Sequence, residues 1–387
     1  MGVFKRPALL LISALCINSL VACGGGESPL SPVASIGAAA FADPTLSVSG
    51  RQSCASCHAE PTGHAAPNDL SVQLGGPDGN VPGLRNSQTL RYLAKNSAFT
   101  VDGDGNPSGG FFWDGRANSL LEQAAGPLLG AREMANPSKA AVVAKVAQAN
   151  WAADFKKVFG KDILTNVDLA FDKLTLALQQ YQLEDRQFNA YSSKFDAYLR
   201  GQTNLSAQEQ RGLALFNDPN KGNCASCHLS AKGTDGSHPL FTDFSYDNLG
   251  VPRNADIPAN ADSNYFDLGL CGRSDLRARI DLCGAFKVPT LRNVVLRKTF
   301  FHNSRFKSLR ETLQFYVQRD TQPEKWYPVI NGVVKKFNDL PDGYLSNVNT
   351  SEAPYNRQVG DAPALSDTEI EDVLVFLATL TDGWQVR

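Results

Sequence analysis

Cys54-Ala-Ser-Cys57-His58 and Cys224-Ala-Ser-Cys227-His228 are two copies of one five-residue pattern. In each copy, two thiols stand at the spacing that adds across the two vinyl groups of a haem, and the histidine after them can bind the iron. The pattern therefore predicts two covalent c-type haems. A zinc knuckle or a redox-active dithiol is the alternative for a single CxxC pair. Two identical copies, each with a histidine directly after, favour the haem interpretation.

The N-terminus has the layout of a secretory signal. Basic residues precede an apolar run, residues 9–20, that is too short to cross a bilayer. The run ends at Leu20-Val21-Ala22-Cys23 and resembles a bacterial lipobox. We therefore expect residues 1–22 to be a lipoprotein signal peptide and Cys23 to be lipidated. An ordinary export signal is the alternative.

The location of the mature chain follows from that signal. Gly24-Gly25-Gly26 opens a segment, residues 23–45, that we expect to be a flexible tether. The mature chain is then periplasmic and lipid-anchored, with no transmembrane helix. The absence of Asp after Cys23 favours the outer membrane.

The cysteines can all be assigned in an exported chain. Of the eight, Cys16 leaves with the signal, Cys23 takes lipid and four attach haem. Cys271 and Cys283 remain, and they flank a short charged loop. In an oxidising compartment a disulfide between them is the favoured interpretation. A free pair in the core is the alternative.

The net charge and the helix-capping patterns restrict the possible fold and partners. The formal net charge is only −2 and no long basic block is present, so nothing points to nucleic acid. Both halves are mainly helical in pattern, with Gly/Pro/Asn loops. Capping boxes at Ser206-Ala-Gln-Glu209 and Ser366-Asp-Thr-Glu369 predict helices to Phe216 and over Ile370–Leu380.

The order of helix, haem motif, long loops and closing helix is that of a class I cytochrome c domain. We expect a mainly α fold with two such domains, residues 46–200 and 205–387, packed in a pseudo-two-fold relation. The first domain should end in a helical stretch over Asp168–Leu199, and Gly201–Leu205 should link the two.

Further motifs surround the two haem motifs. In the first half, Phe112-Trp113-Asp114-Gly115-Arg116 precedes Gln123, Pro127 and Glu133. The second half carries Phe286-Lys-Val-Pro-Thr-Leu-Arg-Asn293, then Phe300-Phe-His-Asn303 and Leu309–Tyr316. In this order the motifs resemble those of the bacterial di-haem cytochrome c peroxidase and MauG superfamily. The resemblance covers nearly all of the mature chain.

Within that superfamily, the second half is most similar to the MbnH-like di-haem enzymes of methanobactin operons. Tyr246-Asp-Asn-Leu-Gly-Val-Pro-Arg253 and Gln314-Phe-Tyr-Val-Gln-Arg-Asp320 are among the segments that carry this similarity. The resemblance implies that hydrogen peroxide oxidises a residue of a partner protein, an MbnP-like tryptophan, through a high-valent di-haem state. Two alternatives stay open: a conventional cytochrome c peroxidase that reduces peroxide to water, and a non-catalytic di-haem electron carrier.

A peroxidase haem needs an open iron position, a base that moves the proton of peroxide, and a dry pocket. The family pattern implies that Glu133 is this base and that Gln123 and Pro127 line the distal face of the Cys54/Cys57 haem. A surface carboxylate is the alternative for Glu133. Trp113 is expected between the haems as a bridge for electrons or holes, and a simple buried aromatic is its alternative.

His64 bears on whether the first iron is open. Conventional di-haem peroxidases close the peroxide site with a loop histidine until the enzyme is reduced. His64 follows His58 by only six residues, too few to reach the opposite haem face. We expect His64 to be a solvated loop residue and the first haem to react without reductive priming.

Tyr316 is expected to bind the second iron. It stands where conventional members place an axial methionine, and Met134 is the mature chain's only methionine. An anionic phenolate favours higher oxidation states of iron, whereas a neutral thioether raises the potential. The alternative for Tyr316 is core packing.

The resemblance also implies a calcium ion between the haems. The Asn86 side chain and the backbone carbonyls of Arg297 and Thr299 stand at the matching positions. Asp102-Gly-Asp-Gly-Asn106 begins like an EF-hand loop but lacks both the turn glycine and the bidentate glutamate. We expect it to be a flexible loop.

Overall fold

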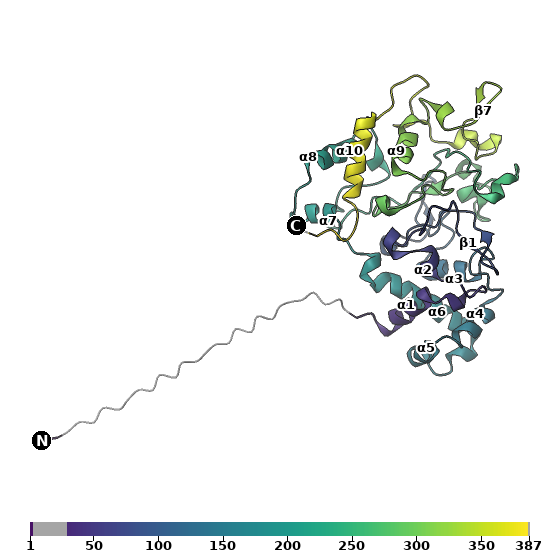
Figure 1. Cartoon of the computed structure of the whole chain (residues 1–387), viewed down its shortest axis with the longest axis vertical. Coiled ribbons are helices and arrows are strands. Elements are labelled where there is room, and N and C mark those ends of the chain that lie inside the picture. The colour runs from purple at the N-terminus through teal and green to yellow at the C-terminus, as the bar shows by residue number, and fades with distance from the viewer. Residues whose placement is uncertain (3–28, 386–387) are drawn as a thin grey trace.

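The structure is a computed structural model that describes residues 1–2 and 29–385. The cleavage and lipidation expected at Cys23 lie outside the described residues, as does most of the expected signal peptide. The described part is mainly helical, as expected (Figure 1). Its α-helices are α1 (Pro32–Ala42), α2 (Cys54–Cys57), α3 (Leu120–Leu129), α4 (Lys139–Val146), α5 (Ala152–Phe159), α6 (Val167–Glu184), α7 (Lys194–Leu199), α8 (Ala207–Asn217), α9 (Leu309–Gln318) and α10 (Asp367–Ala378).

Strands are short and stand in two-stranded antiparallel pairs. They are β1 (Leu74–Gly75) with β2 (Val81–Pro82), β3 (Thr100–Val101) with β4 (Pro107–Ser108), β5 (Tyr246–Asp247) with β6 (Phe286–Lys287), and β7 (Val329–Ile330) with β8 (Val333–Val334). The EF-hand-like stretch forms the turn between β3 and β4, where Asp102 Oδ1 accepts hydrogen bonds from the backbone N–H of Asp104 and Asn106.

Helix α1 corrects the sequence analysis, which placed all of residues 23–45 in a flexible tether. Ser31 caps the helix by accepting a hydrogen bond from the Ala34 N–H. Ile36 and Phe41 are buried in the same cluster as residues of α6. Gly37 allows the close approach, because a Cβ at this position would collide with the Ala177 carbonyl of α6. The polar, glycine-rich start of the segment concealed this packing helix.

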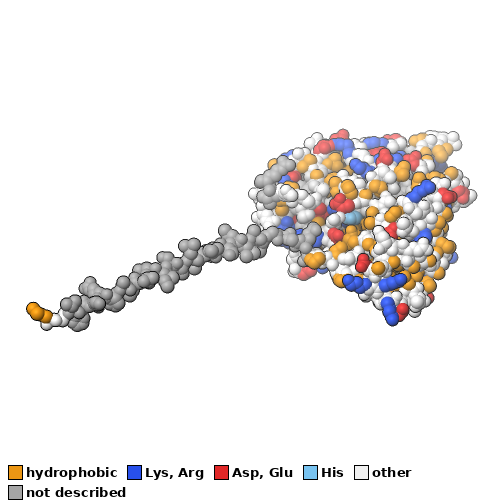
Figure 2. All heavy atoms as spheres, turned by 60° about the horizontal axis from the view of Figure 1, so that its bottom comes forward, with side chains coloured by type: hydrophobic (Ala, Val, Ile, Leu, Met, Phe, Trp, Pro, Cys, Tyr) orange, Lys and Arg blue, Asp and Glu red, His pale blue; other side chains and the backbone are white. Residues whose placement is uncertain are grey.

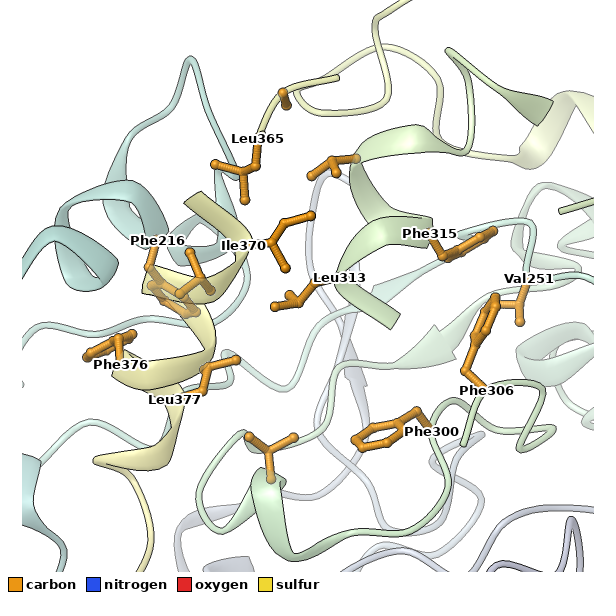
Figure 3. Close-up of a cluster of buried hydrophobic side chains, with 14 of the residues drawn as sticks. Phe216, Val251, Phe300, Phe306, Leu313, Phe315, Leu365, Ile370, Phe376 and Leu377 are labelled. Carbon is orange, nitrogen blue, oxygen red and sulfur yellow. The ribbon is translucent and has the colours of Figure 1, made fainter. Parts of the chain in front are cut away.

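Two hydrophobic clusters organise the chain. The first is built mainly from α1 and α3–α6 and contains buried residues from Ile36 to Phe188. The second contains buried residues from Phe195 to Leu380, which come from α7–α10 and from the loops between them. Side chains of α8, α9 and α10 converge in it (Figure 3). Phe195 of α7 packs in the second cluster, so the chain passes from the first cluster to the second before residue 200. The two-domain division and its pseudo-two-fold relation stay predictions.

The helix ends follow their local sequence. The capping boxes at Ser206 and Ser366 open α8 and α10, as expected. The expected helical stretch Asp168–Leu199 is wrong as one element. Helix α6 ends at Glu184, and a new capping box at Ser193 starts α7. The Ser193-Lys-Phe-Asp196 stretch carries this capping signal, and a 3-10 turn, Arg186–Phe188, occupies the break before it.

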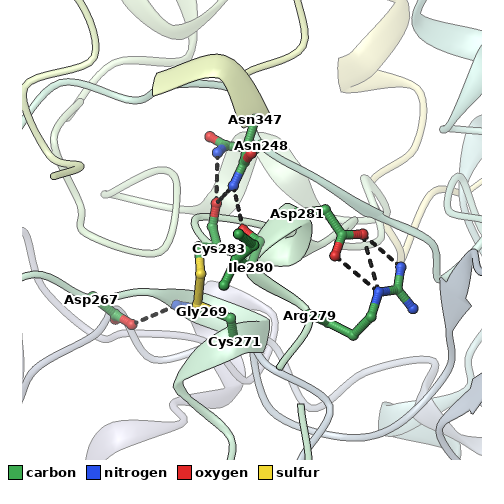
Figure 4. Close-up of a disulfide and its surroundings, with 9 residues drawn as sticks. All are labelled: Asn248, Asp267, Gly269, Cys271, Arg279, Ile280, Asp281, Cys283 and Asn347. Carbon is green, nitrogen blue, oxygen red and sulfur yellow. Dashed lines mark hydrogen bonds and ion pairs between the residues drawn. A yellow bond between two sulfur atoms is a disulfide. The ribbon is translucent and has the colours of Figure 1, made fainter. Parts of the chain in front are cut away.

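Cys271 and Cys283 form the expected disulfide (Figure 4). The Asn248 and Asn347 side-chain amides both donate hydrogen bonds to the Cys283 carbonyl. The bridge therefore fixes the loop that runs into β6, whose next residues line the two cavities described below.

Replacing both Cys271 and Cys283 by Ser is expected to lower the free energy of unfolding by about 3 kcal/mol. The bridge joins residues 12 apart, and closing a loop of this size in the unfolded chain accounts for an effect of about that size. Denaturant unfolding of the variant and the wild type would measure it, with the wild type under a thiol reductant as control. Equal unfolding free energies would contradict the expectation.

The visible surface carries both signs of charge. Lys/Arg and Asp/Glu side chains are interspersed over the face in Figure 2. Among residues 1–2 and 29–385, no helix combines the length and the apolar character needed to cross a bilayer.

Candidate active site

The first haem motif lies in a cavity that we call the first cavity. Cys54, Cys57 and His58 line it, with α2 holding both cysteines at its edge. His58 Nδ1 lies 2.9 Å from the Gln88 carbonyl, to which a protonated Nδ1 donates. That bond leaves Nε2 as the metal-binding nitrogen. Burial lowers the pKa of His58 and favours the neutral ring.

The expected distal residues line the same cavity. Gln123 and Pro127 belong to α3, and Glu133 follows in the turn after it. The turn folds back onto the helix, because the Met134 N–H donates to the Pro127 carbonyl. Burial raises the pKa of Glu133, although the positive charge of Arg116 opposes this shift. The structure thus brings together all three residues expected around the open iron position.

His64 is not solvated, so that expectation was wrong. Only 2% of its surface is exposed, and its ring lies 4.2 Å from that of Phe188. Arg91 Nε donates a hydrogen bond to His64 Nδ1, and burial lowers the pKa of His64 to about 3. The His64 carbonyl lies 3.3 Å from His58 Nδ1, on the side of the proximal ligand. The loop is therefore held on the His58 side of the cavity.

The second haem motif lies in a second cavity with Tyr316. Cys224, Cys227 and His228 line it, together with Tyr316 of α9. His228 Nδ1 lies 2.8 Å from the Phe241 carbonyl, so the same arrangement leaves Nε2 free. Burial raises the pKa of Tyr316. The phenol is therefore neutral in this apolar surrounding until a cation binds its oxygen.

Sequence reasoning missed Tyr355, a second tyrosine of the second cavity. Tyr355 is buried, and its ring lies 6.2 Å from the ring of Tyr316. Arg319 lies over the Tyr355 ring at 4.3 Å. The residue belongs to a loop without regular structure or a recognisable motif, so no local signal pointed to it.

Trp113 lines both cavities, in accord with its expected position between the haems. Its Nε1–H donates to the Asn86 carbonyl at 2.9 Å, and its own carbonyl accepts from the Lys287 N–H. Lys287 and Arg297 also line both cavities. Sequence reasoning assigned no role to Lys287 and gave Arg297 only a backbone-carbonyl role. Burial lowers the pKa of Lys287 to about 7 and that of Arg297 to about 10.

Two of the expected calcium ligands, the Asn86 side chain and the Thr299 carbonyl, lie in contact. Asn86 Nδ2 lies 3.2 Å from the Thr299 carbonyl and 3.1 Å from the Phe301 carbonyl, while its Oδ1 is buried without a hydrogen-bond partner. Exchange of the two amide atoms would direct this oxygen toward the same carbonyls, an arrangement that a cation stabilises. The Asn86 and Thr299 oxygens therefore fit a calcium ion.

Comparison with known proteins places the chain in a family. A family model described as di-haem cytochrome c peroxidase matches residues 31–204. Methylamine utilization protein MauG of Paracoccus denitrificans (strain Pd 1222) is 33% identical over 358 residues, which cover 90% of this chain and 88% of that protein. The chain belongs to the di-haem cytochrome c peroxidase and MauG family. It is therefore an enzyme, a di-haem oxidoreductase with two c-type haems, and this confirms the interpretation of its two haem motifs.

Other similar proteins include named peroxidases. Cytochrome c551 peroxidase of Nitrosomonas europaea is 29% identical and covers 80% of this chain and 84% of its own. The crystal structure of the diheme peroxidase BthA from Burkholderia thailandensis E264 matches with a TM-score of 0.83 and 36% identity, covering 92% of this chain and 88% of its own. A MauG-like protein associated with microbial copper homeostasis shares the fold, with a TM-score of 0.64 and 22% identity.

Proposed function

We propose that this enzyme uses hydrogen peroxide to oxidise a residue of a partner protein through its two haems. One observation carries the proposal: Glu133, Gln123 and Pro127 line the cavity of the first haem motif, and Trp113 joins that cavity to the second. A simple electron carrier has no need of a buried carboxyl group beside its haem.

The residues of the first cavity perform the proton chemistry. When bound, the haems supply the iron that accepts peroxide and store the oxidising equivalents. The Glu133 carboxylate takes the proton from one oxygen of peroxide and returns it to the other, which leaves as water. Gln123 and Pro127 keep bulk water away from this transfer. His58 and His228 would bind the two irons.

The second cavity would hold an iron that has no coordination position open to peroxide. Tyr316 would supply a phenolate ligand to the second iron, and Tyr355 and the other buried aromatic residues would keep this cavity dry. Arg297 bonds to the carbonyls of Ser87 and Thr299, and within the described residues no salt bridge reaches it. Its buried charge would pair with haem propionates.

Several finer assignments belong to this proposal. The Asn86 side chain and the Arg297 and Thr299 carbonyls would hold a calcium ion between the haems. The partner would be an MbnP-like protein that presents a tryptophan. The enzyme would be periplasmic and anchored through lipidated Cys23. The absence of Asp after Cys23 favours the outer membrane as the site of this anchor. The disulfide supports an oxidising compartment.

Reduction of peroxide to water with a small electron donor is the second candidate. The 36% identity to a protein described as a diheme peroxidase favours it. The two functions differ in where the electrons come from. Oxidation of a partner protein by the enzyme and peroxide, with no added donor, would distinguish them.

The ferric enzyme is expected to react with peroxide without prior reduction. The loop of His64 is held on the side of His58, so this histidine cannot close the first iron. Electron paramagnetic resonance of the untreated protein should show one high-spin and one low-spin haem. Peroxide should change the spectrum at once, and a one-electron reduced sample serves as the comparison. A requirement for that reduction would restore the conventional peroxidase.

A further inference from the structure

Tyr92 and Tyr191 form an aromatic pair between the first cavity and the surface. Tyr92 lines the cavity and is 1% exposed. Its ring lies 4.9 Å from the ring of Tyr191, which is only partly buried. Neither residue takes part in the chemistry described above. The pair therefore gives two oxidisable side chains in contact, one beside the haem site and one reaching solvent.

A proton acceptor stands beside the inner tyrosine. The Tyr92 hydroxyl donates a hydrogen bond of 2.6 Å to Asp382 Oδ1 and accepts one from the Tyr191 N–H. Burial, together with the charge of Asp382, raises the pKa of Tyr92, so its phenol is neutral at rest. Loss of an electron makes a phenol strongly acidic, and Asp382 is placed to take the proton.

Arg292 favours this proton transfer, although its guanidinium is also paired with buried Asp196. Its guanidinium lies 4.7 Å from the centre of each of the two tyrosine rings. A positive charge on either ring would be repelled by this cation. A neutral tyrosyl radical avoids the repulsion, because the proton leaves together with the electron.

Tyr181 provides a comparison on the same side of the molecule. Its ring lies 5.5 Å from that of Phe41, and Phe41 lines the first cavity. Tyr181 itself does not line that cavity in the described structure. Phenylalanine is far harder to oxidise than tyrosine, so Phe41 interrupts this path.

We propose that Tyr92 and Tyr191 carry oxidising equivalents from the first haem to the surface, where Tyr191 meets the oxidisable residue of the partner. The inference rests on the proposed function and adds its exit route. Peroxide takes two electrons from the haem pair and, with two protons, gives two waters.

Each equivalent then moves in balanced steps. Tyr92 gives one electron to the haem pair and its proton to Asp382. Tyr191 returns an electron to Tyr92, which regains its proton from Asp382, while the Tyr191 proton passes to solvent. The partner residue then restores Tyr191 with one electron and one proton. Two such transfers return the haem pair to its resting state.

The test uses the holoenzyme, peroxide and the nitrone spin trap DMPO, with no partner protein. Mass spectrometry should find the trap on Tyr191 in the wild type. In Tyr92→Phe this adduct should fall to the level of the sample without peroxide. Tyr181→Phe is the matched control and should keep it. Covalent haem content and the ferric absorption spectrum check that each variant is folded.

A second variant separates a redox role from a structural one. In Tyr191→Phe, rapid-freeze electron paramagnetic resonance should still show a tyrosyl radical, now confined to Tyr92. A merely structural tyrosine pair would show no radical in the wild type. An undiminished Tyr191 adduct in Tyr92→Phe, or an adduct on Tyr181 instead, would overturn the route. Peroxide consumption by the wild type without any tyrosine adduct would overturn the route alone, whereas no reaction with peroxide would overturn the proposed function as well.

Discussion

Glu133→Gln is expected to slow the reaction with peroxide by about 10²-fold or more, the usual scale of general acid-base catalysis. The amide keeps the size of the side chain beside Gln123 and Pro127 but cannot accept the proton of peroxide. Both haems should stay attached. Stopped-flow absorption after mixing with peroxide measures the rate.

The pH dependence supplies a second signature of Glu133. Burial raises the pKa of this carboxyl group, so the base is protonated and inactive below the raised value. The wild-type rate should therefore increase as the pH rises through it, and Glu133→Gln should lack this increase. Exposed Glu122 on α3 offers the matched control, since Glu122→Gln leaves the cavity unchanged. A wild-type rate in Glu133→Gln would assign the proton transfer to another group.

Tyr316→Met is expected to raise the reduction potential of the second haem by on the order of 0.1 V or more, because axial ligands control haem potentials over a wide range. A thioether in place of a phenolate no longer stabilises the oxidised iron. The variant should keep both covalent haems and fail to oxidise a partner protein. A spectroelectrochemical titration measures the potential.

Tyr355 allows a test of whether the effect belongs to Tyr316 and not to any tyrosine of this cavity. It lines the same cavity and packs near Tyr316, so Tyr355→Phe is the matched control. We expect that variant to keep the low-spin spectrum of the second haem. If Tyr355→Phe changed the spectrum and Tyr316→Met did not, Tyr355 would be the ligand. Undiminished protein oxidation by Tyr316→Met would show that this ligand does not determine the activity.

The parts of the site that depend on nearby sequence were predictable. Each of these features lies within a single helix or the turn beside it. They are the two haem motifs, the capping boxes, and the group of Gln123, Pro127 and Glu133. The disulfide was predictable because the other cysteines were already assigned. In each case a short spacing and a known bond geometry determined the outcome.

One error is local, the helix break before α7, and the others concern contacts between distant segments. His64 is buried by Phe188 and Arg91, which no pattern around the histidine reveals. The same holds for Tyr355 beside Tyr316 and for the packing of α1 on α6. Such contacts depend on how separate helices meet, and short motifs contain no information about this.

If Cys23 is lipidated as proposed, the start of α1 at Pro32 limits how far the enzyme could move from a membrane. Only nine residue steps separate Cys23 from Pro32. Even a fully extended chain of this length reaches roughly 30 Å. With Cys23 lipidated as proposed, the folded body would stay within about one protein diameter of the lipid surface. A partner would then have to reach the enzyme close to that surface, and a soluble partner would meet it only there.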